Sequence, residues 1–482
     1  MEESLKEKTA KGLFWSGMNN LGQQVVGVVF GIVMARWLLK PEDYGMMAMI
    51  TVFPLIATTL QNSGFKTALI NQAEVRDEDY NSVFWFNIVV GCALYVLLFC
   101  CAPLIARYYH TPELVALSRY AFLNFVFASF GTAQAAYLTK RMKNKEIAQT
   151  GITAVLLSSL TGLLLAWMGL AYWALATQSI VFIGVNTALL WYHSDWRPTW
   201  HIDFGPMKRM FGFSVKILVS AIATQINSNV MNILLGRYYR AQTVGYYNQG
   251  YQWSFKAYSL IQGMVMQIDQ TVLVGLNNER ERQLAVLRKM IRFTAFIAFP
   301  LLLGFALVAH EFIILTIKEA WEPCVPLLQT LCVSGAFMPL SVLLYDFIIS
   351  KGRSDLYMWN TIALGGCLIT TVILLHPYGI GTMVWGFALV NIGWMFIWFF
   401  FASRLSGYRL VDFLKDTVPF ALTACGVMCI TYLATRSLSN LLLLFIARMA
   451  IAALLYYAVM RIAHVKILDD CLQFIAKKFK KK

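Results

Sequence analysis

The sequence predicts an all-α integral membrane protein with about fourteen transmembrane helices. Of its 482 residues, 59% are hydrophobic and only 13% are charged, whereas a soluble domain carries about 25% charged residues. Apolar runs of about 20 residues, long enough to span a bilayer, recur from one end of the chain to the other. The runs are continuous and do not alternate with period two, so they indicate helices and not a membrane barrel.

These apolar runs define fourteen spans with short connections between them. They cover residues 13–36, 44–66, 82–106, 115–138, 148–168, 171–192, 211–236, 245–272, 291–315, 325–349, 356–375, 380–402, 415–435 and 440–462. The first run follows a basic N-terminal segment without a small-residue cleavage site, so we expect a retained helix and not a signal peptide. No loop is long enough to fold into a catalytic domain.

The distribution of Lys and Arg gives the orientation of these spans. With the N-terminus inside, about 29 basic residues fall on the cytoplasmic side and about 8 on the external side, as the positive-inside rule requires. Both termini are therefore predicted to be cytoplasmic. The net charge of +15 is mainly a topology signal. Nucleic acid is excluded as a partner because the basic residues are spread over many short loops, and membrane lipids are the expected surroundings.

A weak internal repeat relates two halves of the chain at a spacing near 200 residues. Phe14-Trp-Ser16 opens the first span and Gly212-Phe-Ser214 opens the seventh, while Gly45 and Gly245 occupy equivalent turns. Six spans per repeat keep both copies in one orientation, related by a pseudo-two-fold axis along the membrane normal. We therefore predict two six-helix lobes around a central cavity, followed by two accessory spans and a basic tail. The corresponding residue ranges are 1–193, 194–403 and 404–482.

The stretch 209–270 holds two spans that are unusually rich in polar side chains. An ionisable group at membrane depth is costly and normally faces a bundle interior or a water-filled cavity. At 100° per residue, polar residues gather on one face of each span. These faces include Lys216, Ser220, Thr224 and Asn227 in one span, and Gln249, Gln252, Lys256, Gln267 and Gln270 in the next. A similar stripe in the first span includes Asn20 and Gln23.

The lysines in these stripes predict that the cavity binds an anion, and the amides suit sugar hydroxyls. Lys256 lies about ten residues into its helix, too deep to reach the headgroups easily. The predicted substrate-binding residues are Lys216, Lys256, Asn20, Gln23, Asn227, Gln249, Gln252 and Lys66. For each amide, helix packing is the alternative role. Lys66 can instead extend to the cytoplasmic headgroups.

Three further charges lie within predicted spans. Asp269 and Asp346 are candidates for coupling transport to a Na⁺ or H⁺ gradient, and the alternative for each is a pair with a nearby lysine or a place at headgroup level. Arg448 lies outside the repeats, where we expect it to pair locally or face an accessory groove. The nine Cys and six His form no metal-binding spacing. No catalytic motif occurs, so no metal, cofactor or enzymatic activity is predicted.

Several strings resemble one family. They are Lys11-Gly-Leu-Phe-Trp-Ser16, Gly64-Phe-Lys-Thr-Ala-Leu-Ile70, Asp79-Tyr-Asn-Ser-Val-Phe-Trp-Phe-Asn87 and Ala102-Pro-Leu-Ile-Ala-Arg-Tyr-Tyr109 with Pro112-Glu-Leu114. Together with the fourteen spans they are similar to the bacterial polysaccharide transporter family. The resemblance implies a flippase for undecaprenyl-pyrophosphate-linked oligosaccharides. It also implies a superfamily shared with multidrug extruders and lipid II flippases, and a cationic central cavity for the pyrophosphate.

The resulting hypothesis is a flippase of the bacterial inner membrane that works by alternating access. It would serve capsule, exopolysaccharide or O-antigen synthesis, with the glycan polymerase and assembly machinery as candidate partners. One alternative is a cation-coupled antiporter of the same fold for drugs or metabolites, which would need an acidic, aromatic cavity. A membrane glycan polymerase or acyltransferase is the other alternative, and it would need an acid/base constellation or a large external loop.

Overall fold

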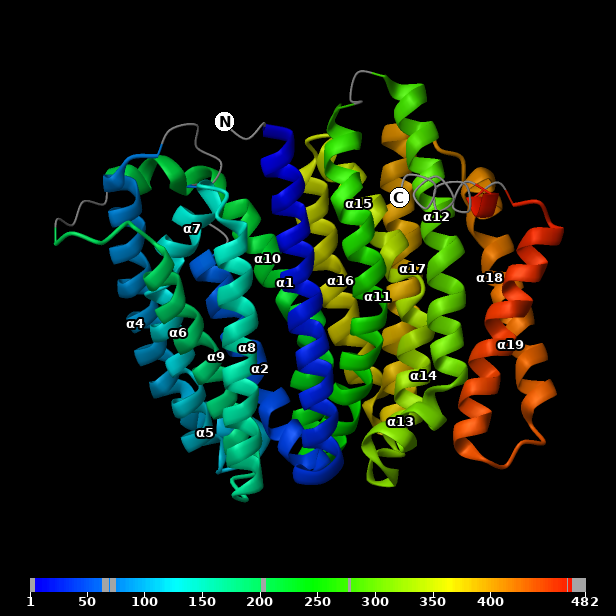
Figure 1. The fold of residues 1–482 in the computed structure, drawn as a ribbon, viewed down its shortest axis with the longest axis horizontal. Coiled ribbons are helices and arrows are strands. Elements are labelled where there is room, and N and C mark those ends of the chain that lie inside the picture. The colour runs from blue at the N-terminus through cyan, green and yellow to red at the C-terminus, as the bar shows by residue number, and fades with distance from the viewer. Residues whose placement is uncertain are drawn as a thin grey trace. The chain divides into compact units, whose positions relative to one another are not determined.

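The computed structural model describes residues 5–62, 69, 75–200, 205–275, 279–465 and 467–469. Within these residues the side chains are described except at 5–14, 60–62, 205–217 and 264–275. Every secondary-structure element in the described part is a helix, which confirms the predicted all-α class. The chain divides into two compact units, Met1–Gly245 and Tyr246–Lys482 (Figure 1).

The first unit consists of long helices joined by short turns. Its elements are α1 (Leu5–Val33) with a π-helical turn (Met34–Leu38), α2 (Pro41–Asn62), α4 (Asp77–Tyr109), α5 (Leu114–Ala121), α6 (Leu123–Ser129), α7 (Thr132–Lys140), α8 (Asn144–Trp167), α9 (Tyr172–His193), α10 (Gly205–Tyr238) and the first turn of α11 (Ala241–Gly275). The predicted span 115–138 is divided into α5, α6 and α7, with a bend of 41° between α6 and α7.

The second unit continues α11 and adds the remaining helices. They are α12 (Arg280–Leu307), α13 (Ala309–Ile317), α14 (Cys324–Gly335), α15 (Met338–Ser350), α16 (Ser354–Leu375), α17 (Ile380–Ser406), α18 (Leu410–Thr435) and α19 (Leu441–Ile462), with short 3₁₀ turns at Glu319–Trp321 and His376–Tyr378. The predicted span 291–315 is broken at Val308, and 325–349 is broken at Ala336 and Phe337.

Within the described part of the chain, each of the fourteen predicted spans overlaps one helix or a run of consecutive helices. Among the described residues, eleven helices are long and apolar enough to cross a membrane, or twelve if α5–α7 count as one bent span. The two other predicted spans correspond to α2 and α11, of 22 and 35 residues. The chain is therefore a multi-pass membrane protein. The exact number of spans, the lobe limits and the pseudo-two-fold symmetry remain predictions.

Two glycines allow α2 and the first turn of α11 to cross in backbone contact within the first unit. A Cβ added to Gly45 would lie 1.7 Å from the Ala241 carbonyl oxygen, and one added to Gly245 would lie 1.8 Å from the Pro41 carbonyl oxygen. The two contacts are reciprocal, because each glycine faces the residue four positions before the other. Such close approach permits Cα–H···O contacts between helices. The sequence placed these glycines at equivalent turns of the repeat.

The segment 194–200, which follows α9, is attached to α4 by residues of the Asp79–Asn87 string. The Asn81 Oδ1 accepts a hydrogen bond from the Thr199 backbone N–H at 2.9 Å, and the Trp85 Nε1 donates to the Thr199 carbonyl oxygen at 2.7 Å. Trp196 is buried in the core of the unit, where its ring contacts Phe84 at a centroid distance of 6.0 Å. This part of the family-like string therefore has a structural role.

Replacing Gly245 by alanine should force α2 and α11 apart, because the new methyl group overlaps a backbone oxygen that cannot move independently of its helix. We expect a loss of about 1–3 kcal/mol in stability, measured as a lower Tm of the purified protein in detergent. Gly17→Ala is the control, since no atom lies within 4 Å of a Cβ at Gly17. A Tm for Gly245→Ala equal to that of Gly17→Ala would show that the helices do not cross here.

Candidate functional site

Lys256 lies near the middle of α11 and approaches an aromatic ring. Its Nζ is 4.5 Å from the centroid of the Trp253 ring, three positions earlier on the same helix face. A cation over the face of an indole is attracted by the ring quadrupole. No ion pair of Lys256 occurs among the residues whose side chains the structure describes. We call Lys256 and Trp253 the anion seat.

The anion seat lies away from the face of α11 that packs on α14. Gly250 approaches the Leu328 backbone, and the Ser254 hydroxyl donates to the Leu331 carbonyl oxygen at 3.0 Å. At 100° per residue, Lys256 projects from nearly the opposite side of the helix. Gln249 and Gln252 lie on the same side as Lys256; Gln249 is buried and Gln252 is exposed. The structure thus brings together three of the predicted binding residues on α11.

The predicted amides of the first unit have different surroundings. Asn20 is exposed on α1. Gln23 is half-buried, and its Nε2 donates to the Asn19 Oδ1 at 2.7 Å. A Cβ added to Gly151 of α8 would lie 2.4 Å from that Nε2, so Gln23 packs against α8. Asn227 is buried in α10. Gln23 therefore contributes to helix packing, and its contact with substrate stays a prediction.

The structure assigns no contact to the substrate for the four other predicted residues. Lys66 lies outside the described residues. Lys216 and Asp269 lie on α10 and α11, but their side chains are outside the described part of the structure. Asp346 is 8% exposed on α15, between apolar neighbours such as Phe347, which is fully buried. The roles of these four residues remain predictions.

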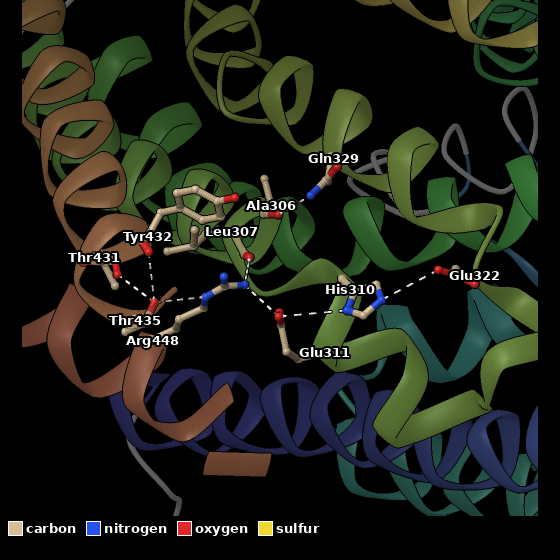
Figure 2. Close-up of polar contacts among 10 residues, drawn as sticks. All are labelled: Ala306, Leu307, His310, Glu311, Glu322, Gln329, Thr431, Tyr432, Thr435 and Arg448. Atoms are coloured by element: carbon tan, nitrogen blue, oxygen red, sulfur yellow. Dashed lines mark hydrogen bonds and ion pairs between the residues drawn. The ribbon is translucent and has the colours of Figure 1, made fainter. Parts of the chain in front are cut away.

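Arg448, from the accessory helix α19, forms a buried ion pair with Glu311 of α13. Figure 2 shows the Arg448 guanidinium between residues of α18 and the break that separates α12 from α13. Its Nη1 donates to the Glu311 Oε1 at 2.7 Å and to the Leu307 carbonyl oxygen at 3.2 Å, and its Nε donates to the Thr435 Oγ1 at 3.3 Å. Arg448 is 7% exposed and Glu311 2%. The expectation that Arg448 pairs locally is confirmed.

A second ionic cluster joins α18 to α12 near the other end of these helices. The Arg288 Nε donates to the Asp416 Oδ2 at 2.8 Å, and the Arg292 Nε lies 3.3 Å from the Asp416 Oδ1. The Tyr408 hydroxyl donates to the same carboxylate at 2.6 Å. The accessory helix α18 is thus bound to α12 by charge as well as by apolar packing.

A cavity of about 720 Å³ opens near the segment 194–200 in the first unit. It is lined by Asp77, Glu78, Asn81, Ser82, Tyr137, Arg141, Asp195, Trp196, Arg197 and Thr199. The Lys143 ammonium, 2.8 Å from Asp195, holds the pKa of that carboxyl below its ordinary value through a hydrogen bond. Acidic and basic side chains both line this cavity, so it has no single charge preference and we assign no ligand to it.

Two features of the site were not predicted from the sequence. Trp253 was not singled out, although its spacing of three from Lys256 places both on one helix face. Glu311 was not singled out, although it is an acidic residue within an apolar run and Arg448 is a basic residue within another. Opposite charges in separate spans are the signal that could have identified this pair.

Comparison with known proteins identifies related chains along most of the sequence. The model of a family described as polysaccharide biosynthesis protein matches residues 33–326. The teichuronic acid biosynthesis protein TuaB of Bacillus subtilis is 25% identical over 434 residues, covering 87% of this chain and 88% of that protein. The lipopolysaccharide biosynthesis protein WzxC of Escherichia coli is 24% identical over 359 residues, covering 73% and 72%.

A solved structure of the lipid II flippase MurJ in an inward closed conformation has the same fold. The TM-score is 0.75 at 15% sequence identity, and the match covers 95% of this chain and 100% of that chain. At this identity the likeness concerns the fold alone.

Replacing Arg448 by methionine should destabilise the protein, because the buried Glu311 carboxyl would lose the guanidinium that donates to it and would keep only the half-exposed His310 ring, 3.9 Å away. Removal of one member of a buried pair costs about 3–5 kcal/mol, so we expect a marked fall in the Tm of the purified protein. The double variant Arg448→Met with Glu311→Leu should recover part of the loss. Arg436→Met serves as the control because Arg436 is exposed at the end of α18. Equal Tm values for Arg448→Met and Arg436→Met would contradict the ion pair.

Proposed function

We propose that this chain, which belongs to the family of polysaccharide biosynthesis proteins among the polysaccharide exporters and flippases, translocates a lipid-linked oligosaccharide. The substrate would be an undecaprenyl-pyrophosphate-linked repeat unit. It would move from the cytoplasmic to the external leaflet of a bacterial inner membrane for capsule, exopolysaccharide or O-antigen synthesis. The names of the relatives associate them with teichuronic acid and lipopolysaccharide synthesis, and the structurally similar MurJ is a lipid II flippase.

The observation that carries this proposal is the position of Lys256. An ammonium near the middle of a membrane helix needs a counter-charge, and the described residues supply the Trp253 ring but no carboxylate. A pyrophosphate would complete the seat, because an ammonium donates three hydrogen bonds and attracts an anion. A cationic drug would instead be repelled by Lys256, so this side chain favours the flippase over a drug antiporter.

The remaining predicted residues would act around this seat. Lys216 would share the pyrophosphate with Lys256, and the amides of Asn20, Gln23, Asn227, Gln249 and Gln252 would meet sugar hydroxyls. Asp269 and Asp346 would couple transport to a Na⁺ or H⁺ gradient. The two lobes would rock to open the cavity inward and outward in turn, while the polyprenyl tail stays in lipid. Both termini would be cytoplasmic, and the polymerase that consumes the repeat unit would act at the external leaflet.

A strain that lacks this protein should accumulate the lipid-linked repeat unit in the cytoplasmic leaflet. The wild-type gene should restore surface polysaccharide, and the double variant Lys216→Gln with Lys256→Gln should restore less than a tenth of it, because two charge contacts to the pyrophosphate are each worth about 1.5–3 kcal/mol. Surface polysaccharide is quantified at equal protein abundance. Lys415→Gln, on an exposed residue of α18, is the control.

Two outcomes would count against this proposal. If the double lysine variant restores as much polysaccharide as the wild-type protein, the lysines do not hold the pyrophosphate. If the deletion strain accumulates the repeat unit in the external leaflet, translocation has already occurred and the protein acts later, as a polymerase would.

A further inference from the structure

Trp253 of the anion seat contacts the short helix α13, and Arg448 binds the same helix. Trp253 is 6% exposed, and its ring meets the Phe312 ring edge-to-face at a centroid distance of 4.9 Å. Phe312 belongs to α13 and directly follows Glu311, the partner of Arg448. A continuous set of contacts therefore runs from α19 through α13 to Trp253 and Lys256, all within the second unit.

The position of α13 depends on contacts outside its own backbone. The helix has only nine residues, and it follows a break after Leu307, the last residue of α12. It ends at Lys318, whose φ of +78° lies in the left-handed region that a non-glycine residue rarely adopts. A helix this short has little stability of its own. Tertiary contacts must therefore fix where it lies.

Arg448 binds both sides of this break. Its Nη1 donates to the Leu307 carbonyl oxygen at the end of α12 and to the Glu311 carboxylate in the first turn of α13. The carbonyls in the last turn of a helix lack partners within that helix, so Arg448 satisfies one of them while it holds α13. Phe312 also contacts Phe305 of α12 at 5.1 Å. These contacts together hold α13 against α12, and they do so beside the place where Phe312 meets Trp253.

The location of Arg448 argues for a role beyond stability. A buried ion pair is weak evidence for stabilisation, because apolar residues of similar size often serve as well. Here the pair joins an accessory helix outside the predicted repeats to α13, the helix whose Phe312 contacts Trp253. A site in which the supporting side chains are held rigidly binds more tightly than one that must be ordered on binding.

We propose that Arg448 is a positioning residue for the anion seat: through Glu311 and α13 it fixes Phe312, which holds Trp253 under the Lys256 ammonium. This inference rests on the proposed function, because it takes Lys256 as the group that meets the pyrophosphate. The accessory helices would then belong to the binding machinery of the second unit. Arg448 would position the anion seat without contacting the substrate.

A double-mutant cycle on ligand affinity tests this proposal. The probe is undecaprenyl pyrophosphate, and its Kd is measured on the full-length protein in nanodiscs. Lys256→Gln should raise the Kd about tenfold, and Arg448→Gln should raise it by a similar factor. The variant with both changes should bind no more weakly than Lys256→Gln alone. Arg448→Gln weakens binding only by misplacing the Lys256 ammonium, and that ammonium is already absent from Lys256→Gln.

Two companion variants separate positioning from general destabilisation. Phe312→Ala leaves the ion pair intact and should reproduce the cycle with Lys256→Gln, which keeps the test valid if Arg448→Gln does not fold. Asp416→Asn weakens the other ionic cluster of α18, and its effect on Kd should multiply with that of Lys256→Gln. Multiplication is expected for distant sites that act independently.

The outcomes identify which claim fails. If Lys256→Gln leaves the Kd unchanged, the anion seat itself is wrong and the proposed function loses its main support. If Lys256→Gln weakens binding while both Arg448→Gln and Phe312→Ala multiply with it or have no effect, the seat stands and the positioning role of Arg448 is overturned.

Discussion

The structure depends on the cost of placing a charge at membrane depth. Because lipid cannot solvate an ion, each cation within a span must find a partner in the chain or in a ligand. Arg448 finds Glu311 at 2.7 Å. Lys256 finds an indole ring, with no carboxylate partner among the described side chains. The chain thus pairs Arg448 within the protein, whereas Lys256 on α11 is the cation that, under the proposed function, would meet an anionic substrate.

The membrane-spanning helices could be predicted from the sequence because hydropathy reports directly on what lipid accepts. The breaks at Val308 and at Ala336 and Phe337 could not, since the residues around them are as apolar as the helices they interrupt. Hydropathy therefore predicts that a segment lies in the membrane, but it does not distinguish a straight helix from a broken one.

Which residues of the candidate site share a helix face could be predicted for a similar reason, whereas their contacts with other helices could not. Helical periodicity places Lys256, Gln249 and Gln252 on one side of α11, which the structure retains. It cannot say which neighbour covers a polar face, so the packing of Gln23 against Gly151 of α8 could not be predicted. Nor can periodicity pair Glu311 with Arg448, which are 137 positions apart. Such contacts arise from tertiary packing, and the residue pattern along a single helix carries no information about that packing.

The central claim is that this protein moves a pyrophosphate-linked glycan lipid between leaflets, and reconstitution of the purified protein tests it most directly. Proteoliposomes would contain an undecaprenyl-pyrophosphate-linked oligosaccharide, and an externally added, membrane-impermeant glycosidase would report the fraction exposed over time. The account predicts that nearly all of the glycan becomes accessible when the protein is present and about half when it is absent, as expected for a lipid divided equally between two leaflets. An accessible fraction that stays at about half with correctly folded protein, under an imposed Na⁺ or H⁺ gradient, would contradict it.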